Sequence, residues 1–304
     1  MHKRSTSYFA LCFFTFTIVA LNNVSADDVE ISSAKSNFTL IQKYVWFAGA
    51  AYQDKSSMQD ICVKYGYTLN QVKTIAGVEV FYFMATNPKT KTIMISVRGT
   101  SNIENALVDV DLKLVPDQYT GIKLHNGFSQ SAQAIFKEIQ PTLNRHYTII
   151  TTGHSLGGAI ALILAMYLDT DGFNVGPIIT FGQPKVTNVQ GAYKFRHLDL
   201  TRVVTPTDLV PLVPPIDPLD INNLDIYWHL GRETILFPGK YYSFLEGLAS
   251  MLRGISFFTK QLSEENLQAH QMTKYLGMVS EKILDNRMIP YDDREKYLEA
   301  GKSN

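Results

Sequence analysis

The chain has 304 residues, of which 45% are hydrophobic, and it carries 28 basic and 28 acidic side chains. This length is enough for one large α/β domain, which we expect rather than two small domains. The balanced charge argues against a nucleic-acid-binding protein.

The first 26 residues have the order of a secretory signal peptide. A basic start, MHKRSTS, precedes an apolar run from Tyr8 to Leu21, and the small residues Val24 and Ala26 suit cleavage after Ala26. The apolar run is short for a membrane span, and an uncleaved anchor is the alternative. We therefore expect a secreted protein, extracellular or periplasmic, with a single mature domain over residues 27–304.

Removal of the signal peptide would change both charge and cysteine content. Lys3 and Arg4 would leave, so that 26 basic residues face 28 acidic ones, a net charge near −2. Cys12 would leave as well, and Cys62 would remain alone. We therefore expect a mature chain without an internal disulfide, stabilised by its core.

The first half of the mature chain predicts a helix followed by a β-hairpin. Residues 37–53 have apolar side chains at helical spacing, with Asn37 as the N-cap. Two β-rich runs, 78–86 and 91–100, flank the turn sequence NPKT. A short amphipathic stretch follows, and then a helix over residues 131–143.

The second half alternates predicted strands with a predicted helix. Residues 148–152 indicate a strand and residues 159–168 a helix, and the sequences PIITFGQPKV and LTRVVTPTDLVPLVPP each indicate a strand that enters a turn-rich loop. Alternation of strands and helices predicts an α/β fold with a mainly parallel sheet.

A G-x-S-x-G pattern, Gly153-His154-Ser155-Leu156-Gly157, lies between that strand and that helix. A sharp strand-to-helix turn needs glycines, because the backbone is strained and packed closely. The turn would present the Ser155 hydroxyl as a nucleophile, next to the first N–H groups of the helix. A glycine turn without chemistry is the alternative. Leu156 N–H, which follows the serine directly, is the first candidate for an oxyanion hole.

A reactive serine needs a base, and a carboxylate that orients the base. In α/β-hydrolase sheets the chain order is serine, acid, histidine. Asp208 follows the predicted strand 201–204, at the end where such sheets place their chemistry. Its alternatives deeper in the loop are Asp217 and Asp225. Two histidines come after the acid, His229 and His270, and the residue pattern leaves both open as the base.

Five motifs in order resemble the fungal-type lipases, the class 3 lipase family. They are RGTSNIEN, LHNGF, GHSLGG, FGQPKVTN and RVVTPTDLVPLVPP, and the resemblance covers about residues 38–276. It implies an α/β-hydrolase fold, with a central mostly parallel sheet flanked by helices and a short lid segment. It also implies hydrolysis of long-chain fatty-acyl esters, typically triacylglycerols, at a lipid–water interface.

The resemblance also implies residue roles. The sequence AHQMTKYLG is similar to the family's segment with the catalytic histidine, which favours His270 as the base. The segment around His229 is similar to a strand with a structural histidine. By resemblance, Thr100 gives its backbone N–H and its hydroxyl to the oxyanion hole.

Two further segments are candidates for contact with lipid. IENALVDVDLKL stands at the place of the family's lid, with Ile103, Leu107 and Val108 on its apolar side, and ordinary core packing is the alternative. The stretch 241–262 predicts a helix with an apolar stripe. That stripe is usually core, and the alternative is a helix beside the acyl groove or on a lipid surface.

The sequence thus predicts a secreted serine ester hydrolase, most specifically a triacylglycerol lipase. A phospholipase A1 or a soluble carboxylesterase is the alternative of the same class, and a catalytically silent lipid-binding protein is the alternative of a different class. No metal-ligand spacing is present and no cofactor is implied. The pattern does not determine the oligomeric state.

Overall fold

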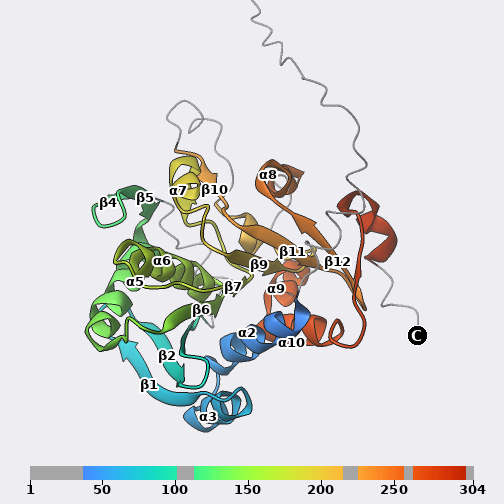
Figure 1. The fold of residues 1–304 in the computed structure, drawn as a ribbon. Coiled ribbons are helices and arrows are strands. Elements are labelled where there is room, and N and C mark those ends of the chain that lie inside the picture. Colours follow the sequence, from blue (N-terminus) through green and yellow to red (C-terminus); the bar gives the residue numbers. More distant parts are fainter. Residues whose placement is uncertain (1–36, 101–112, 215–224, 257–262, 299–304) are drawn as a thin grey trace, which may run out of the picture. The chain divides into compact units, whose positions relative to one another are not determined.

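A mostly parallel β-sheet runs through the part of the protein that the computed structural model describes, namely residues 37–100, 113–214, 225–256 and 263–298 (Figure 1). Within these residues the sheet has nine strands, in the order β1-β2-β3-β6-β7-β9-β11-β12-β13. Their bounds are β1 Thr68–Ile75, β2 Val80–Asn87, β3 Thr92–Val97, β6 Thr148–His154, β7 Ile178–Phe181, β9 Leu200–Val204, β11 Arg232–Leu236, β12 Tyr241–Leu245 and β13 Arg287–Met288.

The five central strands are parallel. β3 pairs with β6, β6 with β7, β7 with β9, and β9 with β11. β1 and β2 add an antiparallel edge on one side, and β12 pairs antiparallel with β11 on the other. Because parallel strands end at one edge, the loops after β3, β6 and β9 all leave from the carboxyl edge of the sheet. This arrangement confirms the α/β fold expected from the sequence.

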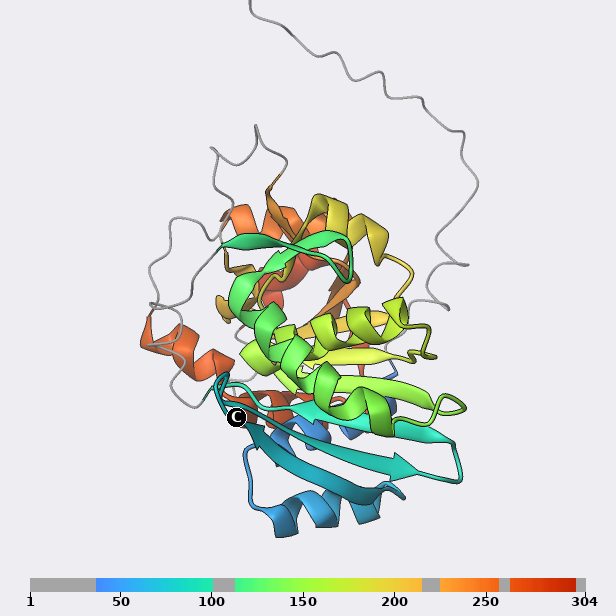
Figure 2. The same cartoon turned by 90° about the vertical axis from the view of Figure 1, so that its left-hand side faces the viewer.

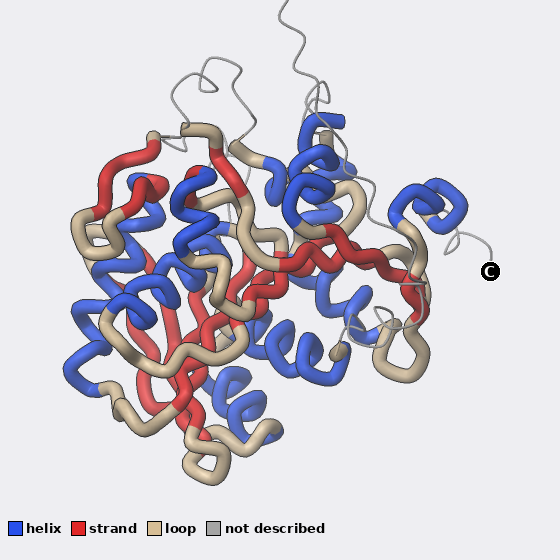
Figure 3. Tube along the Cα trace, turned by 45° about the horizontal axis from the view of Figure 1, so that its top comes forward, coloured by secondary structure: helices blue, strands red, loops and turns tan. Residues whose placement is uncertain are grey.

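Helices cover both faces of this sheet, as Figure 2 shows for the lime helices α5 and α6 on one side and the blue helices α2 and α3 on the other. Figure 3 shows the strands as a band between these layers. The helices are α2 Phe38–Ala50, α3 Lys55–Lys64, α5 Asn126–Ile139, α6 Leu156–Thr170, α7 Val189–Lys194, α8 Gly247–Ser256, α9 Glu264–His270 and α10 Met272–Ser280, with short 3-10 turns η1 Gln140–Thr142, η2 Val210–Leu212 and η4 Tyr291–Tyr297.

Strand residues alternate between two cores. In β3, Ile93 and Ile95 pack with α5 and α6, whereas Met94 packs with α2. In β6, Ile149 and Ile150 divide in the same way. This period of two is what a strand buried on both faces produces.

A second, four-stranded antiparallel sheet lies among the described residues, in the order β10-β8-β5-β4. Its strands are β4 Leu114–Asp117, β5 Ile122–His125, β8 Thr187–Asn188 and β10 Tyr227–Trp228. The sequence analysis did not predict this sheet, because its strands are short and come from distant parts of the chain.

Several predicted elements are confirmed. α2 begins after Asn37, whose side chain accepts a hydrogen bond from Leu40 N at 3.0 Å. β2 and β3 form the expected hairpin, and β6 and α6 flank the G-x-S-x-G turn. α5 begins five residues before the predicted helix, because the side chain of His125 caps its first turn by accepting from Phe128 N.

The prediction of one helix over residues 241–262 is wrong. Residues 241–245 form β12, which pairs with β11 and β13, and α8 begins two residues later at Gly247, which has a φ of +52°. The expected burial of the apolar stripe in the core is also wrong within α8, because Leu248 and Leu252 are 63% and 52% exposed, whereas Ser250 and Arg253 are buried. Residues 257–262 lie outside the described part.

Other predictions fall on residues that the structure does not describe. They are the signal peptide over residues 1–26 and the lid candidates Ile103, Leu107 and Val108. None of the helices in the described part combines the length and the apolar character that a bilayer span requires.

Candidate active site

Ser155 lies in a strained turn between β6 and α6. Its backbone has φ 59° and ψ −133°, a left-handed φ that side chains other than glycine rarely adopt. Ser155 N donates to Phe181 O at 2.8 Å, which fixes the turn against the neighbouring strand. The side chain therefore lies at the carboxyl edge of the sheet, at the N-terminus of α6, where the first amides have no intrahelical acceptor.

The two glycines of the pattern allow the turn to pack. A side chain at Gly153 would collide with the backbone of Gly157, and one at Gly157 would collide with the carbonyl oxygen of Val97. Both positions therefore require glycine because β3, β6 and α6 approach each other closely here. The strained conformation of the turn is a second reason.

Asp208 and His270 meet beside this turn, although 62 positions separate them in the chain. His270 Nδ1 donates to Asp208 Oδ2 at 2.8 Å, and both side chains are almost fully buried, 3% and 0% exposed. Tyr275 OH donates to the same oxygen at 2.5 Å, and Val210 N donates to Asp208 Oδ1 at 2.9 Å. Because Nδ1 carries the proton, Nε2 of a neutral His270 is left as an acceptor.

Gly182 leaves room for this pair. It has φ +58°, and a Cβ there would lie 2.8 Å from His270 Cε1 and 3.0 Å from Asp208 Oδ2. Neither Ser155 Oγ nor His270 Nε2 has a hydrogen-bond partner among the described residues, and both atoms are buried. The structure therefore keeps the two reactive atoms free of other described partners.

His154, the second residue of the pattern, connects three loops of the site. Its Nε2 donates to His270 O at 2.7 Å, and its Nδ1 accepts from Tyr52 OH at 2.9 Å. Tyr52 OH in turn accepts from Gly99 N at 3.1 Å. Burial, and then the neighbouring His270, hold the pKa of His154 well below its usual value. A neutral His154 with its proton on Nε2 satisfies all of these contacts.

Thr100 and Leu156 line one cavity of about 470 Å³. A Cβ at Gly99 would lie 3.0 Å from Ser155 Cβ, so the end of β3 lies against the serine turn. The cavity continues along the apolar side chains Val80, Phe81, Phe128 and Ile160, with Glu79, Arg98, His125 and Ser131 as its polar side chains. The two oxyanion-hole candidates thus border a largely apolar space.

The residues considered as alternatives for the base and the acid make other contacts or lie outside the described part. His229 Nε2 donates to Pro211 O at 2.6 Å, and burial together with Arg202 and Lys185 holds the pKa of His229 well below its usual value. Asp225 pairs with Lys123 at 2.6 Å. Asp217 lies outside the described residues.

A family model described as "Lipase (class 3)" matches residues 94–217, which contain the Gly99-Thr100 strand end, the serine turn and Asp208. Over these residues the chain is similar to the class 3 lipases. The resemblance inferred from its motifs is therefore confirmed.

Curated relatives of the family match part of the chain. A secreted mono- and diacylglycerol lipase of Fusarium solani is 32% identical over 151 residues, 44% of this chain and 43% of the relative. A lipase of Rhizopus niveus is 35% identical over 150 residues, 44% of this chain and 37% of the relative. The chain thus spans about two fifths of the length of these curated relatives.

Solved structures of lipases are similar over a longer range. A lipase from Rhizopus microsporus var. chinensis has a TM-score of 0.56 at 28% identity, over 65% of this chain and 74% of that chain. A mono- and diacylglycerol lipase from Aspergillus oryzae has a TM-score of 0.65, over 78% of this chain and 96% of that chain, and at 20% identity it shows the likeness of fold alone.

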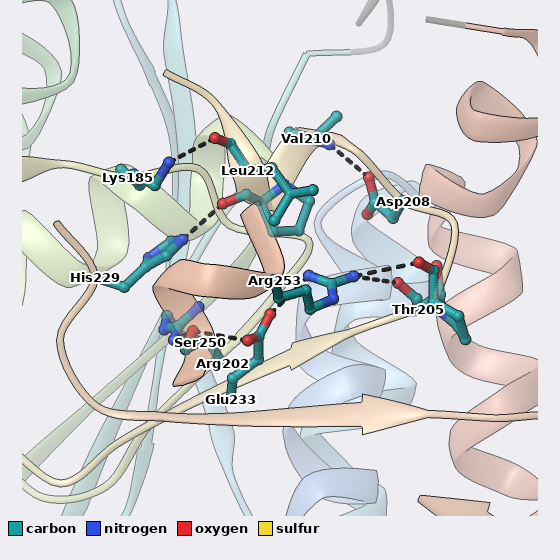
Figure 4. A network of polar contacts seen from close by, with 12 residues as sticks. Lys185, Arg202, Thr205, Asp208, Val210, Leu212, His229, Glu233, Ser250 and Arg253 are labelled. Atoms are coloured by element: carbon teal, nitrogen blue, oxygen red, sulfur yellow. Dashed lines mark hydrogen bonds and ion pairs between the residues drawn. The ribbon is translucent and has the colours of Figure 1, made fainter. Parts of the chain in front are cut away.

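A buried polar network surrounds the turn with Asp208 (Figure 4). Lys185 Nζ donates to Leu212 O and Pro214 O at 2.6 and 2.7 Å, and burial and then Arg202 lower the pKa of Lys185 to about 7. Ser250 links Arg202 to Glu233, and Glu233 pairs with Arg253.

The sequence predicts Ser155, Asp208 and His270 as site residues but indicates no role for Tyr52, Tyr275 or Arg253. Their signal is weak, because a buried tyrosine or arginine in a helix or loop has no spacing that reveals its distant partner. Within the described ranges, no group of three or more His, Cys, Asp or Glu side chains is arranged to hold a metal ion.

Proposed function

We propose that this protein hydrolyses fatty-acyl esters through an acyl-serine intermediate, with Ser155 as nucleophile, His270 as base and Asp208 as the orienting acid. The observation that carries the proposal is the buried 2.8 Å hydrogen bond from His270 Nδ1 to Asp208, next to a serine held in a left-handed backbone conformation. The match of residues 94–217 to the class 3 lipase family model supports the same reaction.

In the first half of the proposed reaction, Ser155 Oγ attacks the ester carbonyl carbon while its proton passes to His270 Nε2. Asp208 stabilises the imidazolium that forms. Leu156 N–H and Thr100 hold the negative oxygen of the tetrahedral intermediate, each donor being worth about 3 to 4 kcal/mol by analogy with other hydrolases. The intermediate collapses, and the leaving alcohol takes the proton from His270.

In the second half, water replaces the alcohol. His270 accepts a proton from the water as it attacks the acyl-serine, and returns that proton to Ser155 Oγ as the carboxylic acid leaves. In structures without substrate such catalytic hydrogen bonds are often long, and they tighten in the reactive complex. Substrate binding would therefore bring Ser155 Oγ and His270 Nε2 into line.

For the substrate, we infer acylglycerols of long-chain fatty acids at a lipid–water interface. The relatives named as mono- and diacylglycerol lipases support partial glycerides next to triacylglycerols. The largely apolar cavity beside Thr100 and Leu156 is suited to part of an acyl chain. Ile103, Leu107 and Val108 remain the proposed lid.

We further propose secretion, with cleavage of a signal peptide near Ala26 and a single mature domain over residues 27–304. The segment is N-terminal, basic and then apolar, and two relatives are named as secreted. Sequencing the N-terminus of the exported protein tests secretion and cleavage, and we expect the N-terminus at Asp27.

The function is tested with emulsified long-chain triacylglycerol, diacylglycerol, phosphatidylcholine and a water-soluble short-chain ester, each with wild type and Ser155→Ala. We expect acylglycerol cleavage that falls by about 10⁶-fold in the variant. Cleavage of phosphatidylcholine alone would indicate a phospholipase A1, and cleavage of the short ester alone a carboxylesterase. If no ester is cleaved and a fluorophosphonate leaves Ser155 unmodified, the lipid-binding alternative holds.

A further inference from the structure

α8 turns a charged residue toward the inside of the protein. The side chain of Arg253 is 1% exposed and its Nη1 donates to Glu233 Oε1 at 2.8 Å, where Glu233 is also 1% exposed. The other terminal nitrogen, Nη2, donates to Thr205 O at 3.2 Å and to Pro206 O at 3.3 Å (Figure 4). One guanidinium therefore joins a strand of the sheet to a loop.

That loop, Thr205–Thr207, leads from β9 to Asp208. Its three consecutive carbonyls accept hydrogen bonds from side chains on two helices: Arg253 of α8 binds the first two, and Asn266 of α9 binds Thr207 O at 2.7 Å. Thr205 O also accepts from Asp208 N, at 3.4 Å, whereas Pro206 O and Thr207 O have side-chain donors where a strand would offer backbone donors. The two helices thereby hold the segment from which Asp208 leaves the sheet.

Glu233 makes Arg253 a rigid support. Glu233 lies in β11, in register with Arg202 of β9, the strand that precedes the turn. Its Oε2 accepts from Ser250 Oγ at 2.7 Å, so both of its oxygens are bound within the network. A planar guanidinium with donors in a fixed fork suits this task, whereas an ammonium group cannot reach a carboxylate and two carbonyls with one geometry.

We propose that Arg253 is a positioning residue of the hydrolase: it fixes the turn Thr205–Thr207 against Glu233 so that Asp208 meets His270 Nδ1. This inference rests on the proposed function. Arg253 lies outside the residues 94–217 that the family model matches, so nothing in that match points to it. Its effect on catalysis passes through Asp208 and it contacts no reacting atom.

The test begins with Arg253→Lys, which keeps the buried positive charge next to Glu233 and loses the fork. We expect the folded variant to lose about tenfold to a hundredfold in kcat on a water-soluble ester, with KM within about twofold, because a displaced acid affects the chemical step. A second variant, Glu233→Gln with Arg253→Met, removes both buried charges together and so avoids an unpaired one.

The matched control is Arg232→Met. Arg232 is the neighbour of Glu233 in β11 and pairs with Glu246, one residue before α8, at 2.7 Å and on the surface, with side chains 39% and 62% exposed. Loss of that pair should leave kcat within about twofold, since surface pairs contribute little.

A double-mutant cycle with Asp208→Asn separates positioning from general loosening of the fold. If Arg253 acts through Asp208, Arg253→Lys should reduce the residual kcat of Asp208→Asn by less than about twofold. An equal fold loss in both backgrounds would overturn the proposal, and so would wild-type kcat in both folded Arg253 variants. Absence of Ser155-dependent hydrolysis in the wild type would instead overturn the proposed function, which keeps the two failures distinct.

Discussion

At the residue scale, Gly182 shows how closely the site is packed. It lies in FGQPKV, which indicates the end of a strand and the loop after it and which also belongs to a motif that resembles the family. Two features explain why this position is a glycine: its positive φ, and the short distances from an added Cβ to His270 and Asp208. The second reason depends on a histidine that lies 88 positions later in the chain, and so no local pattern could indicate it.

We predict that Gly182→Ala lowers kcat/KM by about a hundredfold, because the methyl group must displace His270 or Asp208 from their 2.8 Å contact. The control is Gly172→Ala, which has a similar φ of +75° but nothing within 4 Å of the added carbon. It should cost about 1 kcal/mol of stability and leave kcat/KM unchanged. Ester hydrolysis and urea unfolding of both variants measure this, and equal activities would contradict the steric explanation.

At the element scale, the loop after α2 is tied to the end of β3 and to the serine turn by a single hydroxyl, that of Tyr52. The sequence predicted α2 and β3 well, because their patterns are local and periodic. It could not indicate that Tyr52 OH receives Gly99 N–H and donates to His154. Contacts of this kind depend on how elements meet, and hydrophobic periodicity carries no information about them.

We predict that Tyr52→Phe lowers kcat by about tenfold and stability by about 1 to 2 kcal/mol, because His154 Nδ1 and Gly99 N lose their partner. Tyr44→Phe is the control: this buried tyrosine of α2 donates to Pro177 O at 2.8 Å, at the start of β7. It should lose similar stability with kcat unchanged. If both variants had the same kcat, the chain through His154 would have no part in catalysis.

The segment 241–256 shows where element prediction failed. Its apolar residues fit a helical stripe as well as a strand, and short apolar runs are ambiguous in this way. Residues 241–245 form a strand because they pair with β11. Arg253 of α8 points inward to its buried partner Glu233, and Leu248 and Leu252 are therefore exposed. Arg253 is buried because it pairs with Glu233, 20 positions away, and a local pattern does not indicate so distant a partner.

Because Leu248 and Leu252 are exposed one turn apart, α8 offers an apolar edge that a lipid surface could contact. We predict that replacing both by Ser lowers the rate on emulsified triacylglycerol by about fivefold or more, since each loses roughly 1.5 to 3 kcal/mol of possible burial. The rate on a soluble ester should not change. Val63→Ser, at a 70% exposed position of α3, is the control, and an equal loss on both substrates would exclude this role.

At the scale of the whole molecule, the sequence indicated the parallel centre of the sheet and the residues at its carboxyl edge. Thr100, Ser155 and Asp208 follow the ends of β3, β6 and β9, and the parallel pairing of the central strands is what alternation of strands and helices predicts. The second sheet and the polar network remained unforeseen, because short strands and single buried ions join parts of the chain that are far apart. His270 needed the family resemblance, since elimination left His229 equally possible.

Cys62 provides a probe of how the protein unfolds. Cys62, fully buried in α3, packs in the core that α2 shares with the sheet, and burial raises the pKa of its thiol to about 12. Because the thiolate is the reactive form, labelling with a disulfide reagent should require opening of this core. We therefore expect the labelling rate to follow the fraction unfolded in urea, with a midpoint equal to that of tryptophan fluorescence. Rapid labelling without urea would instead show that α3 opens separately from the sheet, and would place the weakest part of the core at this edge rather than at the site.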